Sequence, residues 1–143
     1  MIDKPLFLLD TNILIYAYEK EESKRKELAK KILEECYTGK ILLAVSNQNI
    51  AEFTSIMLKK IKVDSEIIKK VIDITSEFDG FIKLKYELKT IKEAINLSNK
   101  YGMSFWDSLI SATMLENGIL NIFTENAKDF KIPSLNVINP FLD

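Results

Sequence analysis

Short apolar runs alternate along this chain with longer stretches in which apolar residues recur at helical spacing. The first run, Leu6–Leu9, contains no polar residue, as expected of a strand that is buried on both faces of a sheet. Strands of this kind, separated by amphipathic helices, are typical of an α/β protein with a parallel sheet. With 143 residues the chain has the length of a single domain, 1–143, and is too short for a (β/α)8 barrel of about 250 residues.

The same pattern predicts the order of the elements. Five strands are expected, at Leu6–Leu9, Ile41–Val45, Phe81–Leu84, Ile119–Phe123 and Leu135–Ile138. Six helices are expected. The first runs from 10–12 through Tyr16, and the second covers Leu28–Cys36 after a charged turn at Lys20–Lys26. The other four are Asn47–Lys62 with the cap Ser46, Asp64–Ser76, Lys89–Tyr101 with the stop Gly102, and a last helix from the cap Ser104 to Asn117-Gly118. A loop with one helical turn is expected at Thr124–Asp129.

The sequence contains no histidine and a single cysteine, Cys36. Imidazole is therefore excluded as a general base, a nucleophile partner or a metal ligand, and zinc sites built from cysteine and histidine are excluded with it. Any metal ion must be held by oxygen atoms, which favours Mg²⁺, Mn²⁺ or Ca²⁺. The formal net charge of −1 gives no overall sign of a nucleic-acid-binding protein.

Two further features concern the cellular compartment. No apolar run approaches the ~20 residues that span a bilayer, and Met1–Lys4 lead into the first strand without the pattern of a signal peptide. A lone cysteine cannot form an intramolecular disulfide and suits a reducing environment. We therefore expect a cytoplasmic protein that does not contact a membrane.

Asp10 follows the first predicted strand directly, with Thr11 and Asn12 after it. In open α/β sheets ligands bind beyond the carboxyl ends of the strands, so a carboxylate at this position is a candidate for function. Asp is also a favoured helix N-cap, and a helix is expected to begin here. The two roles are compatible. Asn12 is a candidate for orienting a carboxylate or a bound water, and alone it is equally consistent with an ordinary turn residue.

Two more carboxylates stand near the start of predicted helices. Glu52 lies in the first turns of the helix after the second strand, where favourable charge at a helix N-terminus is by itself the simpler explanation. Asp107 follows Ser104 in a pattern that resembles a capping box. Helical phase also puts Asp107 on the face of Ile110 and Met114, where an unpaired buried carboxylate would be costly and a metal ion would offset the cost.

The loop after the fourth strand adds further oxygen donors, each of which alone is better explained as part of a solvated loop: Thr124, Glu125, Asn126 and Asp129. Together with Asp10, Glu52 and Asp107, these residues are expected at one side of one sheet. Several gathered carboxylates repel one another unless a cation neutralises them. A site of this kind suits Mg²⁺ or Mn²⁺, which activates water and stabilises in-line displacement at a phosphodiester.

The ordered set of motifs resembles the PIN-domain ribonucleases, and most closely the VapC-type toxins of prokaryotic toxin–antitoxin pairs. The motifs that carry the resemblance span nearly the whole chain: Leu8-Leu9-Asp10-Thr11-Asn12, Glu52, Trp106-Asp107-Ser108-Leu109-Ile110-Ser111-Ala112 and Phe123-Thr124-Glu125-Asn126-Ala127-Lys128-Asp129-Phe130. The resemblance implies a three-layer α/β/α fold with a parallel sheet of about five strands. It also implies an endoribonuclease that depends on Mg²⁺ or Mn²⁺ and leaves a 5′-phosphate and a 3′-hydroxyl.

Residue by residue, Asp10, Glu52 and Asp107 match the three strongest acidic positions, which hold the metal, and Asn12 matches the polar residue beside the first. The chain departs from the family pattern at Asn126, where many members carry Asp. Asp129 is then the candidate for a contribution through water, and Glu125 is an unassigned neighbour. This departure concerns the occupancy of a second metal site and leaves the residues expected to hold the first metal ion unchanged.

The resemblance further implies an RNA substrate, a homodimer and a small antitoxin protein that fills the catalytic groove. Two apolar helices are candidate interfaces, Ile13–Tyr18 and Ile67–Ile74, although core packing is the simpler explanation for each single residue. Clusters of cations are candidate RNA contacts, although most are expected to be solvated helix faces: Lys24-Arg25-Lys26, Lys30-Lys31, Lys59-Lys60-Lys62 and Lys69-Lys70.

Other functions remain open from the sequence. A non-catalytic or RNA-processing PIN-like domain has the same pattern, and the departure at Asn126 is compatible with lost catalysis. A receiver-type α/β signalling domain also places acids at strand ends. It needs a phosphoacceptor Asp after a middle strand, however, where this chain has Ser46-Asn47.

Overall fold

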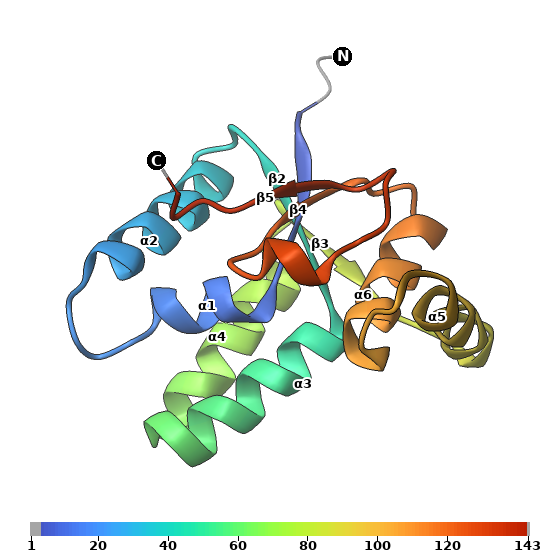
Figure 1. The fold of residues 1–143 in the computed structure, drawn as a ribbon. Coiled ribbons are helices and arrows are strands. Elements are labelled where there is room, and N and C mark those ends of the chain that lie inside the picture. The colour runs from blue at the N-terminus through green and yellow to red at the C-terminus, as the bar shows by residue number, and fades with distance from the viewer. Residues whose placement is uncertain (1–3, 143) are drawn as a thin grey trace.

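A five-stranded parallel sheet forms the centre of the molecule, as the sequence predicts (Figure 1). The computed structural model describes residues 4–142, so most of the N-terminal stretch Met1–Lys4 lies outside it. The strand order is β3-β2-β1-β4-β5. The strands are β1 (Leu6–Leu9), β2 (Leu42–Ser46), β3 (Phe81–Leu84), β4 (Asn121–Phe123) and β5 (Asn136–Ile138). The next two strands along the chain, β2 and β3, lie on one side of β1, and the last two, β4 and β5, lie on its other side. The direction of strand addition therefore reverses at β1, which makes it the switch point of the sheet.

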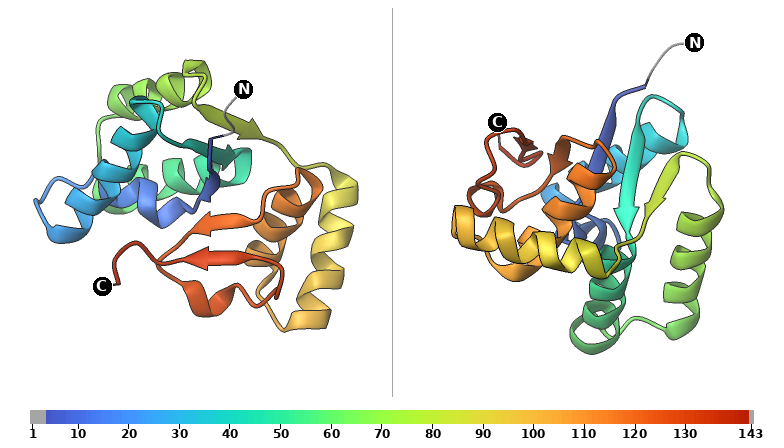
Figure 2. Two further views of the ribbon diagram at one scale, coloured as in Figure 1. Left: turned by 90° about the horizontal axis from the view of Figure 1, so that it is seen from above. Right: turned by 90° about the vertical axis from the view of Figure 1, so that its right-hand side faces the viewer.

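Helices cover both faces of the sheet and complete the predicted three layers (Figure 2). Alternate strand residues enter different cores, so that Leu9 packs with α1 (Thr11–Ala17), α2 (Lys24–Tyr37), α3 (Asn47–Ile56) and α4 (Ser65–Glu77). Leu8 packs on the opposite side with α5 (Leu88–Tyr101) and α6 (Phe105–Glu116). None of the helices in residues 4–142 is both long and apolar enough to cross a membrane.

The last two strands are shorter than predicted because their first residues have other partners. The Ile119 N–H donates to the Met114 carbonyl at 2.9 Å and closes the end of α6. The Leu135 N–H donates to the Ile132 carbonyl at 3.0 Å in a turn. Both side chains are buried in the core, so the apolar pattern was a correct sign of burial but not of strand pairing.

The predicted charged turn Lys20–Lys26 is wrong at its second half. The helix α2 already begins at Lys24, because the Ser23 side chain accepts the Lys26 N–H at 3.1 Å and caps the first turn. The charged residues of this region are therefore partly the solvent face of a helix. The helical turn expected within Thr124–Asp129 is present as the 3-10 turn η2 (Ala127–Asp129).

The predicted helix Asn47–Lys62 is not one regular α-helix. The regular part ends at Ile56, and a π-helical segment, η1 (Met57–Ile61), follows. Lys62 then has a left-handed conformation with φ 53°, and its N–H donates to the Met57 carbonyl. The apolar periodicity of the sequence does not distinguish an α-turn from the wider π-turn, which explains why this change was missed.

The left-handed backbone at Lys62 generates a prediction about stability. A residue with a Cβ is strained by about 1–2 kcal/mol in this conformation, whereas glycine is not. We expect Lys62→Gly to raise the free energy of unfolding, measured in urea, by about 1 kcal/mol. The control Lys60→Gly lies inside η1 and should lower the free energy of unfolding by about 1 kcal/mol. A Lys62→Gly protein less stable than the wild type would contradict the assigned conformation.

Candidate active site

Asp10 lies at the carboxyl end of β1, between the ends of β2 and β4. Its Oδ1 accepts the Thr11 N–H at 2.8 Å, so it caps α1. Its Oδ2 accepts the hydroxyl of Thr124, the residue after β4, at 2.7 Å. Asp10 as a residue is only 8% exposed. The capping role predicted from the sequence is confirmed, and the second oxygen joins the ends of two neighbouring strands.

The buried position changes the proton affinity of Asp10. Burial raises the pKa of this carboxyl above its ordinary value of 3.8, and the hydrogen bonds from Thr124 and Thr11 oppose the rise. The negative charges of Asp107 and Asp129 raise the pKa further, which shows that both carboxylates lie within electrostatic reach of Asp10.

Glu52 is half-buried in the second turn of α3, and a chain of polar residues connects it with Asp10. The Thr11 hydroxyl donates to Glu52 Oε1 at 3.2 Å. The Asn49 amide donates to the same Thr11 hydroxyl at 3.0 Å. The Ser46 hydroxyl and N–H donate to the amide oxygen of Asn49 at 2.9 and 3.0 Å. The Ser46 hydroxyl also accepts the Asn49 N–H at 3.1 Å, which confirms the predicted cap at Ser46. Burial raises the Glu52 pKa, and the charges of Asp10 and Asp107 add to the rise.

This polar chain was not found in the sequence, although a signal was present. Asn49 stands three residues after Ser46, the spacing of a capping box, and the side chains of both residues are buried. The capping box uses only the oxygen of the Asn49 amide, so its buried NH2 group needs an acceptor elsewhere, and the Thr11 hydroxyl provides one.

Asp107 lies in the first turn of α6 and is half-buried. The Ser104 hydroxyl donates to Asp107 Oδ2 at 3.0 Å and accepts the Asp107 N–H at 3.2 Å, so the predicted cap at Ser104 is confirmed. Burial raises the pKa of the Asp107 carboxyl and the charge of Asp129 contributes, while the Ser104 hydrogen bond lowers it.

The loop after β4 lies beside this cluster. Thr124 is fully buried on Asp10 and also accepts the Asn126 N–H at 3.0 Å. The Asp129 side chain, at the end of η2, is exposed, and its charge acts on both Asp10 and Asp107. The Glu125 carboxylate accepts a hydrogen bond from the Tyr16 hydroxyl of α1. The Asn126 side chain is exposed.

Asn12 is a sequence-predicted residue for which the structure shows no side-chain partner among residues 4–142. It follows Thr11 in the first turn of α1 and is half-buried. Its side chain makes no hydrogen bond with any residue between 4 and 142, so its proposed role beside Asp10 stays a prediction.

The donor chemistry of the acidic cluster, defined as Asp10, Glu52, Asp107 and Asp129, fits a hard divalent cation. All its ligand atoms are carboxylate oxygens, and the charges of its members act on one another. Two buried side-chain atoms have no hydrogen-bond partner among the described residues. They are Oε1 of Gln48, which lies on α3 as Glu52 does, and Oγ of Ser108, which follows Asp107. No three acidic or cysteine side chains in residues 4–142 are already arranged closely enough to hold a metal ion. Binding would therefore require the carboxylates to draw together.

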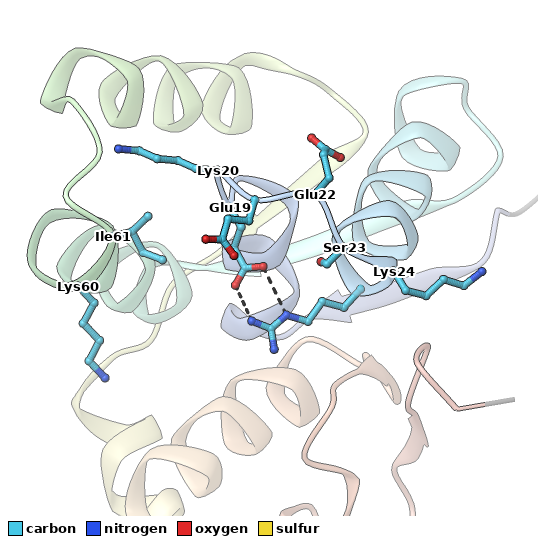
Figure 3. A pocket seen from close by; sticks show the side chains of 9 residues that line it. Glu19, Lys20, Glu22, Ser23, Lys24, Lys60 and Ile61 are labelled. Carbon is cyan, nitrogen blue, oxygen red and sulfur yellow. Dashed lines mark hydrogen bonds and ion pairs between the residues drawn. The ribbon is translucent and has the colours of Figure 1, made fainter.

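A cavity of about 620 Å³ lies elsewhere, where the connection between α1 and α2 meets η1 (Figure 3). Cations and carboxylates both line it, including Lys20, Lys60, Glu19 and Glu22. No residue of the acidic cluster lines this cavity. The cavity lining has mixed charge and favours no ligand class. We therefore take the acidic cluster, and not the cavity, as the candidate active site.

Comparison with known proteins agrees with the fold. The family model for the PIN domain matches residues 7–133. Among solved structures, a toxin–antitoxin complex from Klebsiella pneumoniae has a TM-score of 0.69 at 24% identity, covering 94% of this chain and 98% of that chain. No curated protein sequence matches at a significant level.

Two other solved structures show the same likeness. VapBC2 from Rickettsia felis, bound to a DNA fragment from its promoter, has a TM-score of 0.66 at 23% identity, covering 94% of this chain and 98% of that chain. VapC20 of Mycobacterium tuberculosis, described as a sarcin–ricin loop cleaving toxin, has a TM-score of 0.64 at 14% identity, covering 84% and 91%. At these identities the likeness shows the fold.

The raised pKa of Asp10 predicts a pH-dependent stability in the presence of EDTA. A carboxyl whose folded pKa lies above its unfolded value stabilises the fold at low pH, and this contribution is lost as the pH rises above about 3.8 and through the folded pKa. We expect Asp10→Asn to raise Tm by a few degrees at pH 7, and the difference from wild type to shrink toward pH 4. The exposed Asp73→Asn is the control. A lower Tm for Asp10→Asn at pH 7 would contradict the electrostatic account.

Proposed function

The chain belongs to the PIN domain family, and we propose that it is a metal-dependent endoribonuclease, the toxin of a type II toxin–antitoxin pair. The observation that carries the proposal is the gathering of Asp10, Glu52, Asp107 and Asp129 at one edge of the sheet, with charges that act on one another. The fold shared with VapC20, a sarcin–ricin loop cleaving toxin, supports RNA as the substrate class. Family membership removes the receiver-type alternative.

We assign the binding of Mg²⁺ or Mn²⁺ to Asp10, Glu52 and Asp107, with Asp129 adding negative charge. When bound, the ion supplies Lewis-acid activation of water and neutralises charge on the phosphodiester. The oxygen-only cluster fits such an ion, because a cation would neutralise the carboxylate charges that add to the burial-raised pKa values of Asp10 and Glu52. The sequence contains no histidine, so the chain has no pair of imidazoles to act as acid and base when the RNA 2′-hydroxyl attacks the phosphorus.

The residues around the cluster orient the carboxylates. Thr124 donates to Asp10, Thr11 donates to Glu52, and Ser104 donates to Asp107. Each donor fixes one oxygen and leaves further lone pairs on the carboxylate free. Partners of this kind orient metal ligands and reduce the rearrangement that binding and reaction require. Thr124 is the most deeply buried of the three donors.

Protein partners are proposed from the same likeness. The solved relatives include a toxin–antitoxin complex and VapBC2, which supports an antitoxin partner and, with the family, a homodimer in the cytoplasm. In the described structure Ile13 and Ile15 of α1 are buried in this chain's own core. On α4, Ile67 and Ile74 are 51% and 45% exposed and are the better candidates for contact with a partner.

The cleavage assay is the first test of the proposal. We expect the wild type to cut RNA with Mg²⁺ or Mn²⁺, and EDTA to stop the reaction. Asp107→Asn should slow cleavage by roughly 100-fold or more, because it removes a charge from the ion-binding set. The control Asp73→Asn, on the exposed face of α4, should cut at the wild-type rate. Cleavage by Asp107→Asn at the wild-type rate would contradict the assignment.

A folded protein that binds Mn²⁺ but cuts none of a panel of structured and single-stranded RNAs would instead support the non-catalytic alternative. In that case Asn126, where many members carry Asp, is the first position to restore. Asn126→Asp would be assayed for gained cleavage beside the wild type.

The salt dependence of RNA binding tests the lysine clusters. Some cations are already paired with neighbouring acids, as Lys26 is with Glu22 and Lys69 with Glu66. Lys59 and Lys60 form no ion pair with any residue in the described range 4–142 and remain available for phosphate contacts. We expect RNA affinity, measured with Asp107→Asn to prevent cleavage, to fall as salt rises. An affinity that does not change with salt would exclude extensive phosphate contact.

A further inference from the structure

We propose that Tyr16, held by Arg25, is a positioning residue that fixes the loop Thr124–Asp129 through Glu125. By holding this loop, Tyr16 sets the places of Thr124 and Asp129 relative to the acidic cluster. The effect on cleavage rests on the proposed nuclease function, whereas the effect on the loop does not.

The first observation is a contact between parts of the chain that are distant in sequence. The Tyr16 hydroxyl, on the last turns of α1, donates to the Glu125 carboxylate, 109 residues further along the chain. Burial and the Glu125 charge raise the pKa of Tyr16 to about 12, so the hydroxyl stays protonated and remains a donor at neutral pH. Glu125 therefore has a specific partner and is not a free carboxylate of a solvated loop.

The second observation is that the Tyr16 ring is itself held from two directions. The Arg25 guanidinium lies 4.1 Å from the ring centroid in a cation–π contact. Phe141 packs edge-on, with ring centroids 5.5 Å apart. These contacts fix the direction of the hydroxyl toward the loop.

Arg25 is in turn fixed by Glu19. Its guanidinium makes two hydrogen bonds to the Glu19 carboxylate, at 2.8 and 3.4 Å, which are the dashed lines of Figure 3. Arg25 is the only arginine in the sequence. A planar guanidinium can both bind a carboxylate with two donors and stack on an aromatic ring, which a lysine ammonium cannot do. The residue type therefore matches the position.

The third observation is that Glu125 is held at its backbone as well. The Asn139 amide donates to the Glu125 carbonyl at 3.1 Å, and the Phe141 N–H donates to the Asn139 side chain at 2.9 Å. Phe141 is the residue that packs on Tyr16, so the segment after β5 and α1 hold Glu125 together. The structure thereby assigns Glu125 to anchoring the loop.

The anchor lies next to the residues that matter for the cluster. Thr124 precedes Glu125 and donates to Asp10. The Asn126 N–H donates back to Thr124, and the Asp129 N–H donates to the Asn126 carbonyl at 3.0 Å. Because these bonds are consecutive along a short loop, release of Glu125 would loosen both Thr124 and Asp129.

Hydrogen–deuterium exchange of the EDTA-treated full chain tests the anchor without reference to catalysis. We expect Tyr16→Phe to speed amide exchange in peptides covering 124–130 about tenfold, the effect of losing one hydrogen bond to a charged group. Exchange in β1 and β2 should not change. Tyr101→Phe is the matched control, since the Tyr101 hydroxyl makes no hydrogen bond within residues 4–142.

Two further variants separate the anchor from general packing. Glu125→Gln keeps an oxygen that can accept from Tyr16, so its loop should remain largely protected, whereas Glu125→Ala should exchange like Tyr16→Phe. Arg25→Lys keeps the positive charge but loses the planar pair of donors that binds Glu19. Its loop should exchange at a rate between those of the wild type and Tyr16→Phe. Equal loop protection in Tyr16→Phe and wild type, or faster exchange spread evenly over the whole chain, would overturn the proposal.

Activity and metal binding then measure the consequence for the site. Tyr16→Phe should lower kcat for RNA cleavage with little change in KM, and it should weaken Mn²⁺ binding measured by calorimetry. If the wild type cuts no RNA, the nuclease proposal fails, and the exchange experiment still decides whether Tyr16 anchors the loop. If the wild type cuts RNA and Tyr16→Phe matches it in kcat and in Mn²⁺ affinity, the loop anchor does not position the cluster.

Discussion

The hydrogen bond between Thr124 and Asp10 is the contact on which the arrangement of the site depends. It joins the ends of the adjacent strands β1 and β4 through two residues that are 114 positions apart in the sequence. A carboxylate buried at the end of a central strand is costly, and two donors offset part of that cost. The same carboxylate begins α1. One side chain therefore terminates a strand, starts a helix and supplies the first acid of the cluster.

Glu52 and Asp107 are held by the same principle, with hydroxyl donors in place of cationic partners. Thr11 is held by Asn49 and donates to Glu52, and Ser104 donates to Asp107. Hydroxyl donors keep the negative charge of the cluster intact, whereas lysine or arginine partners would neutralise it. The only arginine is instead used at Tyr16, at the far end of α1. The fold thus keeps net negative charge where a cation is expected to bind.

Much of the fold could be predicted from the sequence, because it depends on local patterns. The uninterrupted apolar strands, the caps Ser46 and Ser104 and the stop at Gly102 are each set by a few adjacent residues. The start of α2 and the π-turn at Met57–Ile61 were missed, because charge and apolar spacing are the same in either conformation. The first residues of β4 and β5 were predicted too early, because burial does not require strand pairing, whereas the ends of both strands agree with the prediction.

The candidate site likewise has one part that could be predicted from the sequence and one part that could not. The positions of the acids follow from strand ends and helix starts, so sequence reasoning could name them. The residues that orient the acids depend on contacts between distant segments, such as Thr11 with Glu52 and Tyr16 with Glu125. Such pairs have no spacing rule, and each partner alone looks like a surface or turn residue. A cluster of like charges must be held by something, however, so a predicted acidic site also predicts that donors of this kind exist. Their identity is what the three-dimensional structure adds.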